Sequence, residues 1–254
     1  MSSIKVVIIE DHELTRFGIV TALSANEHIE VCGEADNGFL GLSLIKKHHP
    51  DLALVDINLP DIDGAELCNK IKDVFPTKVI ILTADNTQDT VTKAFRYGAD
   101  SYCIKNLPKA KLAEALYATY KGESWIDPTI GKFLIENIKS PIQSPETKAL
   151  CNTPKTHNKI SHRKEHTCGS SVLSNREIDV LQLIVQGMSN EEIATKLYIS
   201  IGTVRSHVHR ILEKLNCKSR SQAAFKAISE GLVATPSGED ADDSKHKVQN
   251  LLIA

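Results

Sequence analysis

The sequence lacks the features that mark membrane and secreted proteins. Its 254 residues contain no run of about 18 consecutive apolar residues, the length expected of a membrane-spanning helix. No signal-peptide pattern is found in its first residues. The six cysteines are scattered, without a C-x-x-C pair, and give no sign of a disulfide framework. We therefore expect a cytoplasmic protein with reduced cysteines and no membrane partner.

The chain also lacks a dominant charge, since 30 lysines and arginines oppose 32 aspartates and glutamates. The distribution is uneven: residues 1–122 carry 13 basic and 17 acidic side chains, whereas residues 172–234 carry 8 and 6. A mildly basic second half is compatible with a nucleic-acid partner. Charge alone leaves open a solvated helix face on a small protein-binding module.

Residues 4–121 alternate strand and helix patterns five times. Strands are predicted at residues 4–9, 29–33, 52–56, 79–83 and 101–104. Helices are predicted at residues 14–23, 38–47, 64–75, 87–97 and 109–120. The first, third and fourth strands are the most uniformly apolar and should lie at the centre of the sheet. The pattern predicts an α/β domain, a doubly wound five-stranded parallel sheet with helices on both faces.

The patterns divide the chain into four parts, and its length allows two modest domains. Residues 1–122 form the α/β domain. Residues 123–171 have few apolar residues and repeated prolines, which predicts a flexible, disordered linker, although residues 125–128 could cap the first domain. Residues 172–234 are predicted to be wholly helical, and residues 235–254 to be a disordered tail.

Serine-led capping motifs divide the helical region into four short helices. Capping boxes begin at Ser174, Ser189 and Ser219, and Ser200 is predicted to cap the third helix. That helix carries one apolar stripe at helical spacing, formed by Ile201, Val204, Val208, Ile211, Leu212 and Leu215. Short helices around a tight turn at residues 198–200 predict a small all-α helix-turn-helix domain.

Polar side chains follow the predicted strands at their carboxyl ends. Ligands of open α/β sheets bind at that edge, so these side chains should meet there. Glu10, Asp11 and Asp56 would need a cation to offset their mutual repulsion, and oxygen ligands favour Mg²⁺. Asp56 could then act as a nucleophile toward an activated phosphoryl group, with Lys105 offsetting charge on its oxygens.

These residues, in this order, resemble the receiver domain of two-component response regulators. The resemblance spans residues 4–121 and rests on Glu10-Asp11, the segment from Asp56 to Gly64, Leu82-Thr83-Ala84 and Lys105. It implies a flavodoxin-like fold in which Asp56 accepts a phosphoryl group from a sensor histidine kinase. It also implies that Mg²⁺ is bound by Glu10, Asp11, Asp56 and the backbone carbonyl of Asn58.

The receiver resemblance further implies a conformational switch. Thr83, Ala84 and Lys105 would contact the phosphoryl group, and Tyr102 would turn inward as Thr83 moves toward that group. The face formed by the fourth helix, fifth strand and fifth helix would then change its partners. For Tyr102 the alternative is a core or edge aromatic without a switch role.

The third helix of the helical region fits the recognition position of a helix-turn-helix, because a short helix and a tight turn precede it. Arg205 could pair with guanine or phosphate there. Further basic side chains could meet the DNA backbone, namely Arg210, Lys214, Lys218 and Arg220. The helix starts at Thr203 and Ser219 offer backbone amides to phosphate.

The helical region resembles the LuxR-type DNA-binding domain, on the strength of residues 173–177, 187–194 and 200–208. With the receiver-like region before it, the chain is similar to the NarL/FixJ class of transcription regulators. The likeness implies that Arg205, Ser206 and His209 face the bases and that residues 222–230 dimerise. His209 stands where this class often carries lysine, which bears on phosphate affinity. The linker is long for the class, which weakens the expectation that the receiver packs on the recognition helix.

The combined interpretation is a non-enzymatic transcription regulator. Phosphorylation of Asp56 would favour a homodimer that binds double-stranded promoter DNA, with RNA polymerase as a candidate further partner. Two alternatives keep the receiver: an adaptor whose helical domain binds protein, and a DNA-binding regulator independent of phosphate. A phosphohydrolase is disfavoured, because Asn58 stands where many such enzymes need a second aspartate as general acid. A metal site in the linker is also disfavoured, since its candidate ligands are irregularly spaced: His157, His162, His166 and Cys168.

Overall fold

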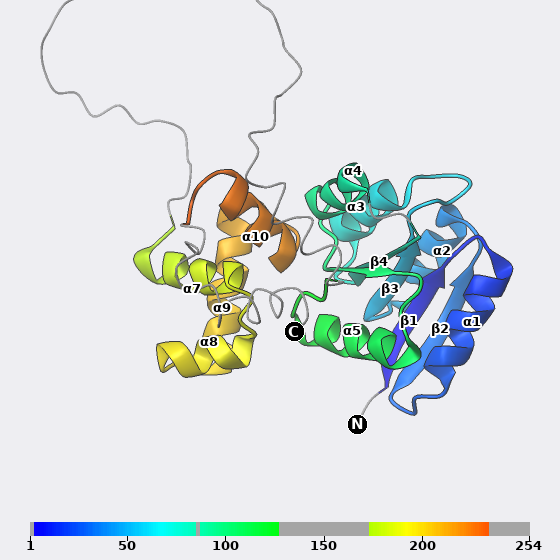
Figure 1. Cartoon of the computed structure of the whole chain (residues 1–254), viewed down its shortest axis with the longest axis horizontal. Helices are drawn as coiled ribbons and strands as arrows, with labels where there is room; N and C mark the ends of the chain where they lie inside the picture. Colours follow the sequence, from blue (N-terminus) through cyan, green and yellow to red (C-terminus); the bar gives the residue numbers. More distant parts are fainter. Residues whose placement is uncertain (1–2, 85–86, 127–172, 234–254) are drawn as a thin grey trace, which may run out of the picture.

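The computed structural model describes residues 3–84, 87–126 and 173–233, which form an α/β domain and a helical domain (Figure 1). Most of the predicted linker, with its candidate metal ligands, and the predicted tail lie outside the described residues. Among the helices that are described, none combines the length and apolar character needed to cross a bilayer.

The first domain is built on a five-stranded parallel sheet in the order β2-β1-β3-β4-β5. The strands are β1 (Ile4–Ile9), β2 (Ile29–Ala35), β3 (Leu52–Asp56), β4 (Lys78–Thr83) and β5 (Ser101–Ile104). The three most apolar strands, β1, β3 and β4, occupy the centre of the sheet, which confirms the prediction. Central parallel strands are covered on both faces, and β3 is accordingly buried along its whole length.

Helices cover both faces of the sheet, which confirms the doubly wound architecture (Figure 1). They are α1 (Glu13–Ser24), α2 (Gly38–His48), α3 (Gly64–Val74), α4 (Gln88–Arg96) and α5 (Lys109–Lys121). One core joins α2, α3 and α4 to Val7 and Ile9, and the other joins α1 and α5 to Val6 and Ile8. Two cores arise because successive side chains of a strand point to opposite faces.

The residues after α5 close the outer edge of β5. The backbone amide of Tyr102 donates to the carbonyl oxygen of Trp125 at 2.9 Å, and Tyr102 pairs with Ile126 in an isolated parallel bridge. Trp125 and Ile126 are buried, each in a different core of the domain. The packed domain therefore extends to at least Ile126, beyond the boundary predicted at residue 122, because these two residues fill both cores and satisfy β5.

The second domain consists of α7 (Asn175–Val185), α8 (Asn190–Leu197), α9 (Ile201–Leu215) and α10 (Arg220–Ser229). The four helices share one apolar core, to which α9 contributes the fully buried Val204 and Ile211. Tyr198, in the left-handed backbone region, makes the tight turn between α8 and α9. Ile201 departs from the predicted apolar stripe, since it is 39% exposed at the start of α9.

The helix starts follow the predicted capping chemistry with one difference. The boxes at Ser174 and Ser189 are complete, with both reciprocal hydrogen bonds present. At α10, Ser219 accepts the amide of Gln222, as predicted. The Oε1 atom of Gln222 accepts the amide of Lys218 instead of that of Ser219, so the third box is shifted by one residue.

Candidate functional site

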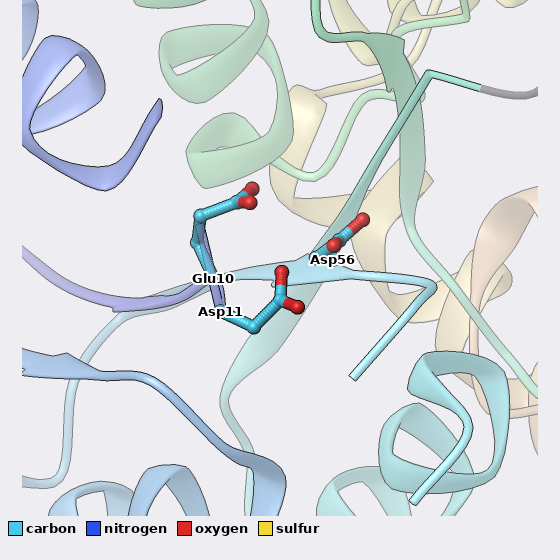
Figure 2. A group of neighbouring side chains, drawn as sticks. All are labelled: Glu10, Asp11 and Asp56. Atoms are coloured by element: carbon cyan, nitrogen blue, oxygen red, sulfur yellow. The ribbon is translucent and has the colours of Figure 1, made fainter. Parts of the chain in front are cut away.

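Three carboxylates converge at the carboxyl edge of the sheet (Figure 2). Glu10 and Asp11 follow β1, Asp56 ends β3, and one oxygen from each lies within 4.8 Å of the others. Glu10 and Asp56 are buried, whereas Asp11 is exposed. The side chains meet because β1 and β3 are neighbours in the sheet and end at the same edge.

Lys105, directly after β5, bridges two of these carboxylates. Its Nζ lies 2.9 and 2.8 Å from Oε1 and Oε2 of Glu10, and 2.9 Å from Oδ2 of Asp56. Burial would lower the pKa of Lys105, but its hydrogen bonds to Glu10 and Asp56 outweigh burial and raise that pKa. Burial raises the pKa of Glu10, while the hydrogen bond from Lys105 opposes the rise. One ammonium group thus faces three carboxylates, which leaves the site attractive to a cation.

The donor atoms suit a hard divalent cation. Asp56 Oδ1 is buried and has no hydrogen-bond partner among the described residues. A buried carboxylate oxygen without a partner is costly unless an ion or water completes it. The loop after Asp56 is held in place by an isolated antiparallel bridge between Asn58 and Asp63. Clustered carboxylate oxygens are the kind of ligand that Mg²⁺ prefers.

The strand β4 brings the predicted hydroxyl to the same edge. Asp56 pairs in register with Leu82, and Thr83 follows at the end of β4, where it is fully buried. Ala84 comes next and is exposed. The amide of Lys105 donates to the carbonyl oxygen of Thr83 at 2.8 Å, so a backbone hydrogen bond joins two of the three residues predicted to contact a phosphoryl group.

Tyr102 lies inside the domain in this structure. It is fully buried, and its ring centroid lies 6.1 Å from that of Phe95 on α4, with the ring planes tilted by 34°. In the sheet register Tyr102 stands beside Ile81 of β4, two residues before Thr83. The inward position that the receiver resemblance implies for a switch aromatic is therefore the position observed here.

The loop between Asp56 and α3 is tightly packed, which explains Gly64. A Cβ atom at Gly64 would lie 2.0 Å from the carbonyl oxygen of Asp56, so no other residue fits there without a shift of the backbone. Asp63 caps α3, and its Oδ2 lies 3.0 Å from Nζ of Lys93 on α4. Sequence reasoning missed Lys93, because no local pattern links α4 to this loop.

The residues predicted to read DNA lie on the exposed face of α9. Those exposed are Thr203, Arg205, Ser206, His209 and Arg210. The amide of Thr203 donates to Oγ of Ser200 at 3.1 Å, which corrects its predicted availability to phosphate, since the helix cap already uses that amide. His209 Nε2 lies 3.4 Å from an oxygen of Glu213, one turn further along.

Two further residues predicted to contact DNA have protein partners in this structure. Nζ of Lys218 lies 2.6 Å from Oδ1 of Asn69 and 2.5 Å from Oδ1 of Asp73, both on α3 of the first domain. Arg220 donates to Oδ1 of Asn190 at 3.1 Å within the helical domain. Burial lowers the pKa of Arg220 to about 10, so the guanidinium remains charged at neutral pH.

An ion pair beneath the recognition helix was also missed by sequence reasoning. Glu177 of α7 is only 3% exposed, and its Oε2 lies 2.7 Å from Nζ of Lys214 on α9. The hydrogen bond from Lys214, with one from the Ser174 amide, lowers the pKa of Glu177 to about 2. Lys214, which the sequence placed among the DNA-backbone contacts, therefore contacts α7 instead. The capping box at Ser174 was the available signal, since it already placed Glu177 at a fixed position.

Comparisons with known proteins agree with both halves of this arrangement. Residues 6–117 match the response regulator receiver domain, and residues 171–227 match the luxR family of bacterial regulatory proteins. The chain is 32% identical over 233 residues to the transcriptional regulatory protein DegU of Brevibacillus brevis, covering 91% of this chain and 96% of DegU.

A second relative and a solved structure have the same organisation or part of it. The response regulator protein VraR of Staphylococcus epidermidis is 34% identical over 232 residues, covering 91% of this chain and 99% of VraR. A LuxR-family two-component response regulator from Aurantimonas covers 53% of this chain and 97% of its own, with 25% identity and a TM-score of 0.51. The chain therefore belongs to the response regulators that join a receiver domain to a LuxR-type DNA-binding domain.

Proposed function

We propose that this chain is a phosphorylation-gated, DNA-binding transcription regulator with Asp56 as its phosphoacceptor. The observation that carries the proposal is the state of Asp56, a buried carboxylate beside two others, with one oxygen bound to Lys105 and the other unpaired among the described residues. Such a cluster is a poor stabilising element, because buried like charges repel. It is well suited to receive a phosphoryl group with a cation.

The proposed transfer is a displacement at phosphorus. An oxygen of Asp56 bonds to phosphorus while the bond from phosphorus to the nitrogen of a sensor kinase phosphohistidine breaks. The bonding pair leaves with the imidazole nitrogen, which takes up a proton. Lys105, already 2.9 Å from Oδ2 of Asp56, and the hydroxyl of Thr83 can donate to the new phosphoryl oxygens. The product is an acyl phosphate on the protein itself, so no external substrate is turned over.

We assign Mg²⁺ to Glu10, Asp11, Asp56 and the backbone carbonyl of Asn58. The ion would supply positive charge opposite the phosphoryl oxygens. The side chains around it are already held: Lys105 bonds Glu10, and Arg16 donates to the carbonyl oxygen of Glu10 at 2.7 Å. These contacts fix the turn that presents Glu10 and Asp11.

We assign promoter DNA to the exposed face of α9, with Arg205, Ser206 and His209 toward the base edges and Arg210 toward the backbone. The side chain of Thr203 and, once free of their present partners, Lys218 and Arg220 would add backbone contacts. The relative DegU is named a transcriptional regulatory protein, which supports this assignment. The proposed partners are a sensor histidine kinase, double-stranded DNA and a second copy of the chain through α10, with RNA polymerase as a candidate further partner.

The test is DNA capture from the source genome, with the protein either untreated or treated with acetyl phosphate and Mg²⁺. We expect treatment to enhance capture and to label the protein with an acyl phosphate, and Asp56→Ala to abolish both effects. Asp89→Ala, which removes an exposed carboxylate on α4, is the control and should behave as the natural chain. Labelling retained in Asp56→Ala would move the nucleophile elsewhere. Equal capture with and without treatment would leave a DNA-binding protein that does not respond to phosphate.

A further inference from the structure

The turn between α8 and α9 carries three exposed residues whose identities the fold does not explain. Tyr198 ends α8, and Ile201 and Gly202 begin α9. We call these three residues the α8–α9 edge. In a folded domain, a residue that breaks a local preference without a gain in packing is a candidate for a functional role.

Tyr198 holds an unfavourable backbone conformation. Its φ and ψ are 54° and 44°, in the left-handed region that glycine adopts at little cost and other L-residues rarely adopt. Its side chain is 95% exposed, so the ring adds little to the core. The turn is held by other groups, since the amide of Ile199 donates to the carbonyl oxygen of Ala194 at 3.0 Å. For the fold alone, glycine would be the better residue at this position.

Ile201 exposes an aliphatic side chain at the first position of α9. It is 39% exposed, whereas Val204 and Ile211 of the same helix are fully buried. The fold therefore removes only part of this side chain from water, and the rest of its apolar surface is left for another partner.

Gly202 leaves space beside Ile201 that the described part of the domain does not fill. A Cβ atom added to Gly202 would lie 3.7 Å from Oγ of Ser200, its nearest atom, which is an ordinary contact. The backbone is helical there, and alanine favours a helix more than glycine does. Neither packing nor backbone conformation therefore requires glycine. A position without a side chain is useful where another molecule approaches the backbone closely.

The α8–α9 edge continues the face of α9 to which the proposed function assigns DNA. Ile201 and Arg205 are four residues apart, so they lie on the same side of the helix. In a helix-turn-helix, the first residues of the recognition helix approach the base edges in the major groove, while the preceding helix crosses the DNA backbone. This geometry directs Ile201 toward the bases and Tyr198 toward the phosphates.

The chemistry of the two side chains indicates which groups of the DNA they would contact. The base edges in the major groove carry one apolar group, the C5-methyl group of thymine, and apolar side chains pack against it. A tyrosine hydroxyl can donate to a phosphate oxygen without adding charge. The missing side chain at Gly202 would let the sugar-phosphate backbone come close to the start of α9.

We propose that the α8–α9 edge selects thymine at one position of the bound DNA. Ile201 packs against the thymine methyl group, the hydroxyl of Tyr198 donates to a neighbouring phosphate, and Gly202 leaves room for the DNA. This inference rests on the proposed function. It adds a base preference that Arg205 does not supply, since arginine pairs with guanine.

The first test removes the methyl group from the DNA. The full-length chain, treated throughout with acetyl phosphate and Mg²⁺, selects duplexes from a synthetic pool with a randomised core. Each thymine of the best-bound duplex is then replaced in turn by deoxyuridine, which lacks only the methyl group. For the natural chain, one replacement should weaken binding about fourfold in fluorescence anisotropy titrations, the loss expected for one buried methyl group.

Variants at Ile201 assign that loss to a residue. Ile201→Ala should bind the thymine and deoxyuridine duplexes equally, whereas Ile201→Val should keep a preference for thymine. The matched control is Leu40→Ala on α2, which shortens a side chain of similar exposure, 43%, and should keep the full fourfold preference.

The second test measures stability and binding together. Tyr198→Gly should raise the midpoint of thermal unfolding, because it relieves the backbone, and should weaken DNA binding about fivefold through the lost hydrogen bond. Gly202→Ala should also raise the midpoint and weaken binding, because its methyl group favours the helix but meets the DNA. Tyr198→Phe, which lacks only the hydroxyl, should lose affinity without a gain in stability.

Two controls make the same backbone changes away from the α8–α9 edge. Asn216→Gly relieves a left-handed residue with a φ of 50° at the other end of α9. Gly18→Ala adds a methyl group to an exposed position of α1 where a Cβ atom would have no neighbour within 4 Å. Both should raise the thermal midpoint and leave DNA binding unchanged.

The outcomes separate this inference from the proposed function. A deoxyuridine effect that persists in Ile201→Ala, or that is absent from the natural chain, would overturn the thymine contact. Affinities of Tyr198→Gly and Gly202→Ala equal to those of their controls would overturn the role of the edge while leaving a DNA-binding protein. A natural chain that selects no duplex would overturn both the proposed function and the inference that rests on it.

Discussion

The proposed phosphoryl site and the proposed DNA-reading face of α9 place charge in opposite environments. Glu10 and Asp56 are almost wholly buried and depend on Lys105 for compensation within the protein. Arg205 and His209 lie on the surface, and the side chain of His209 is 74% exposed. Buried charges must be balanced where they stand, whereas exposed charges keep their water until a partner displaces it. Substitutions should therefore change folding in the first region and binding alone in the second.

The largest effect on this contrast should come from removing Lys105, the partly buried cation that pairs with Glu10 and Asp56. Lys105→Met should lower the free energy of unfolding by about 3 kcal/mol in urea titrations without Mg²⁺, because it leaves neighbouring carboxylates uncompensated. Mg²⁺ should restore part of the loss. The control is Lys111→Met, whose exposed pairing with Glu114 at 2.8 Å should be worth less than about 1 kcal/mol. Equal losses for the two variants would show that Lys105 does not balance the cluster.

Substitutions on the exposed face of α9 should change the affinity for DNA without changing the stability of the fold. Arg205→Ala should weaken binding to a captured DNA site by about 1–3 kcal/mol in fluorescence anisotropy titrations. Its thermal unfolding should match that of the natural chain, since the side chain is exposed. Lys46→Ala on α2 removes the same charge far from α9 in sequence and is the control. Unchanged affinity for Arg205→Ala would remove this residue from the interface.

Glu177 is a buried carboxylate inside the DNA-binding domain. Its substitution should therefore change the stability of the fold, as expected for the buried charges of the receiver. The pKa of Glu177 is about 2, below its ordinary 4.5, so its stabilising effect is complete above about pH 4.5 and is lost as the pH falls toward 2. Glu177→Gln should lower the free energy of unfolding by about 1 kcal/mol at pH 7 in urea titrations. The variant's free energy of unfolding should also fall less steeply as the pH is lowered. Glu213→Gln, at an exposed position on α9, should leave both unchanged.

The smallest expected effect is that of a substitution at Arg210, which tests whether this residue contacts the DNA backbone and not the bases. Arg210→Ala should reduce the steepness of log K against log salt by about one phosphate contact, with little change in sequence preference. Titrations at several salt concentrations measure this slope. If the natural chain binds DNA with no salt dependence, the helical domain fits the protein-binding adaptor better.

Much of the receiver was predictable because its signals are local. The strand β3 was predicted with its observed bounds, and the rule that ligands lie at carboxyl ends of parallel strands assembled Glu10, Asp56 and Lys105. Apolar uniformity placed β1, β3 and β4 at the centre. The helix starts in the second domain followed from serine caps, since a cap needs only residues a few positions apart.

The contacts that sequence reasoning missed join residues far apart along the chain. Lys218 meets Asp73 across 145 positions, and no period or motif connects them. Gln222 was expected to complete a capping box at Ser219, but its Oε1 accepts the amide of Lys218 and its Nε2 donates to the receiver carbonyl of Arg96. Trp125 lay in a stretch that composition assigned to the linker and that was also predicted as a possible cap on the first domain, but no local pattern gave its partner, the amide of Tyr102. In each case the packing of a distant element decides the partner.

The pairing of Trp125 and Ile126 with β5 has a consequence for how the chain avoids aggregation. A bare strand edge is a template on which other chains can add strands. Here Trp125 and Ile126 pair with β5 at Tyr102, so the residues that follow α5 cover part of the outer edge of the sheet. A fragment cut at Gly122 would expose that edge and should self-associate, whereas a fragment cut after Ile126 should stay monomeric at the same concentration.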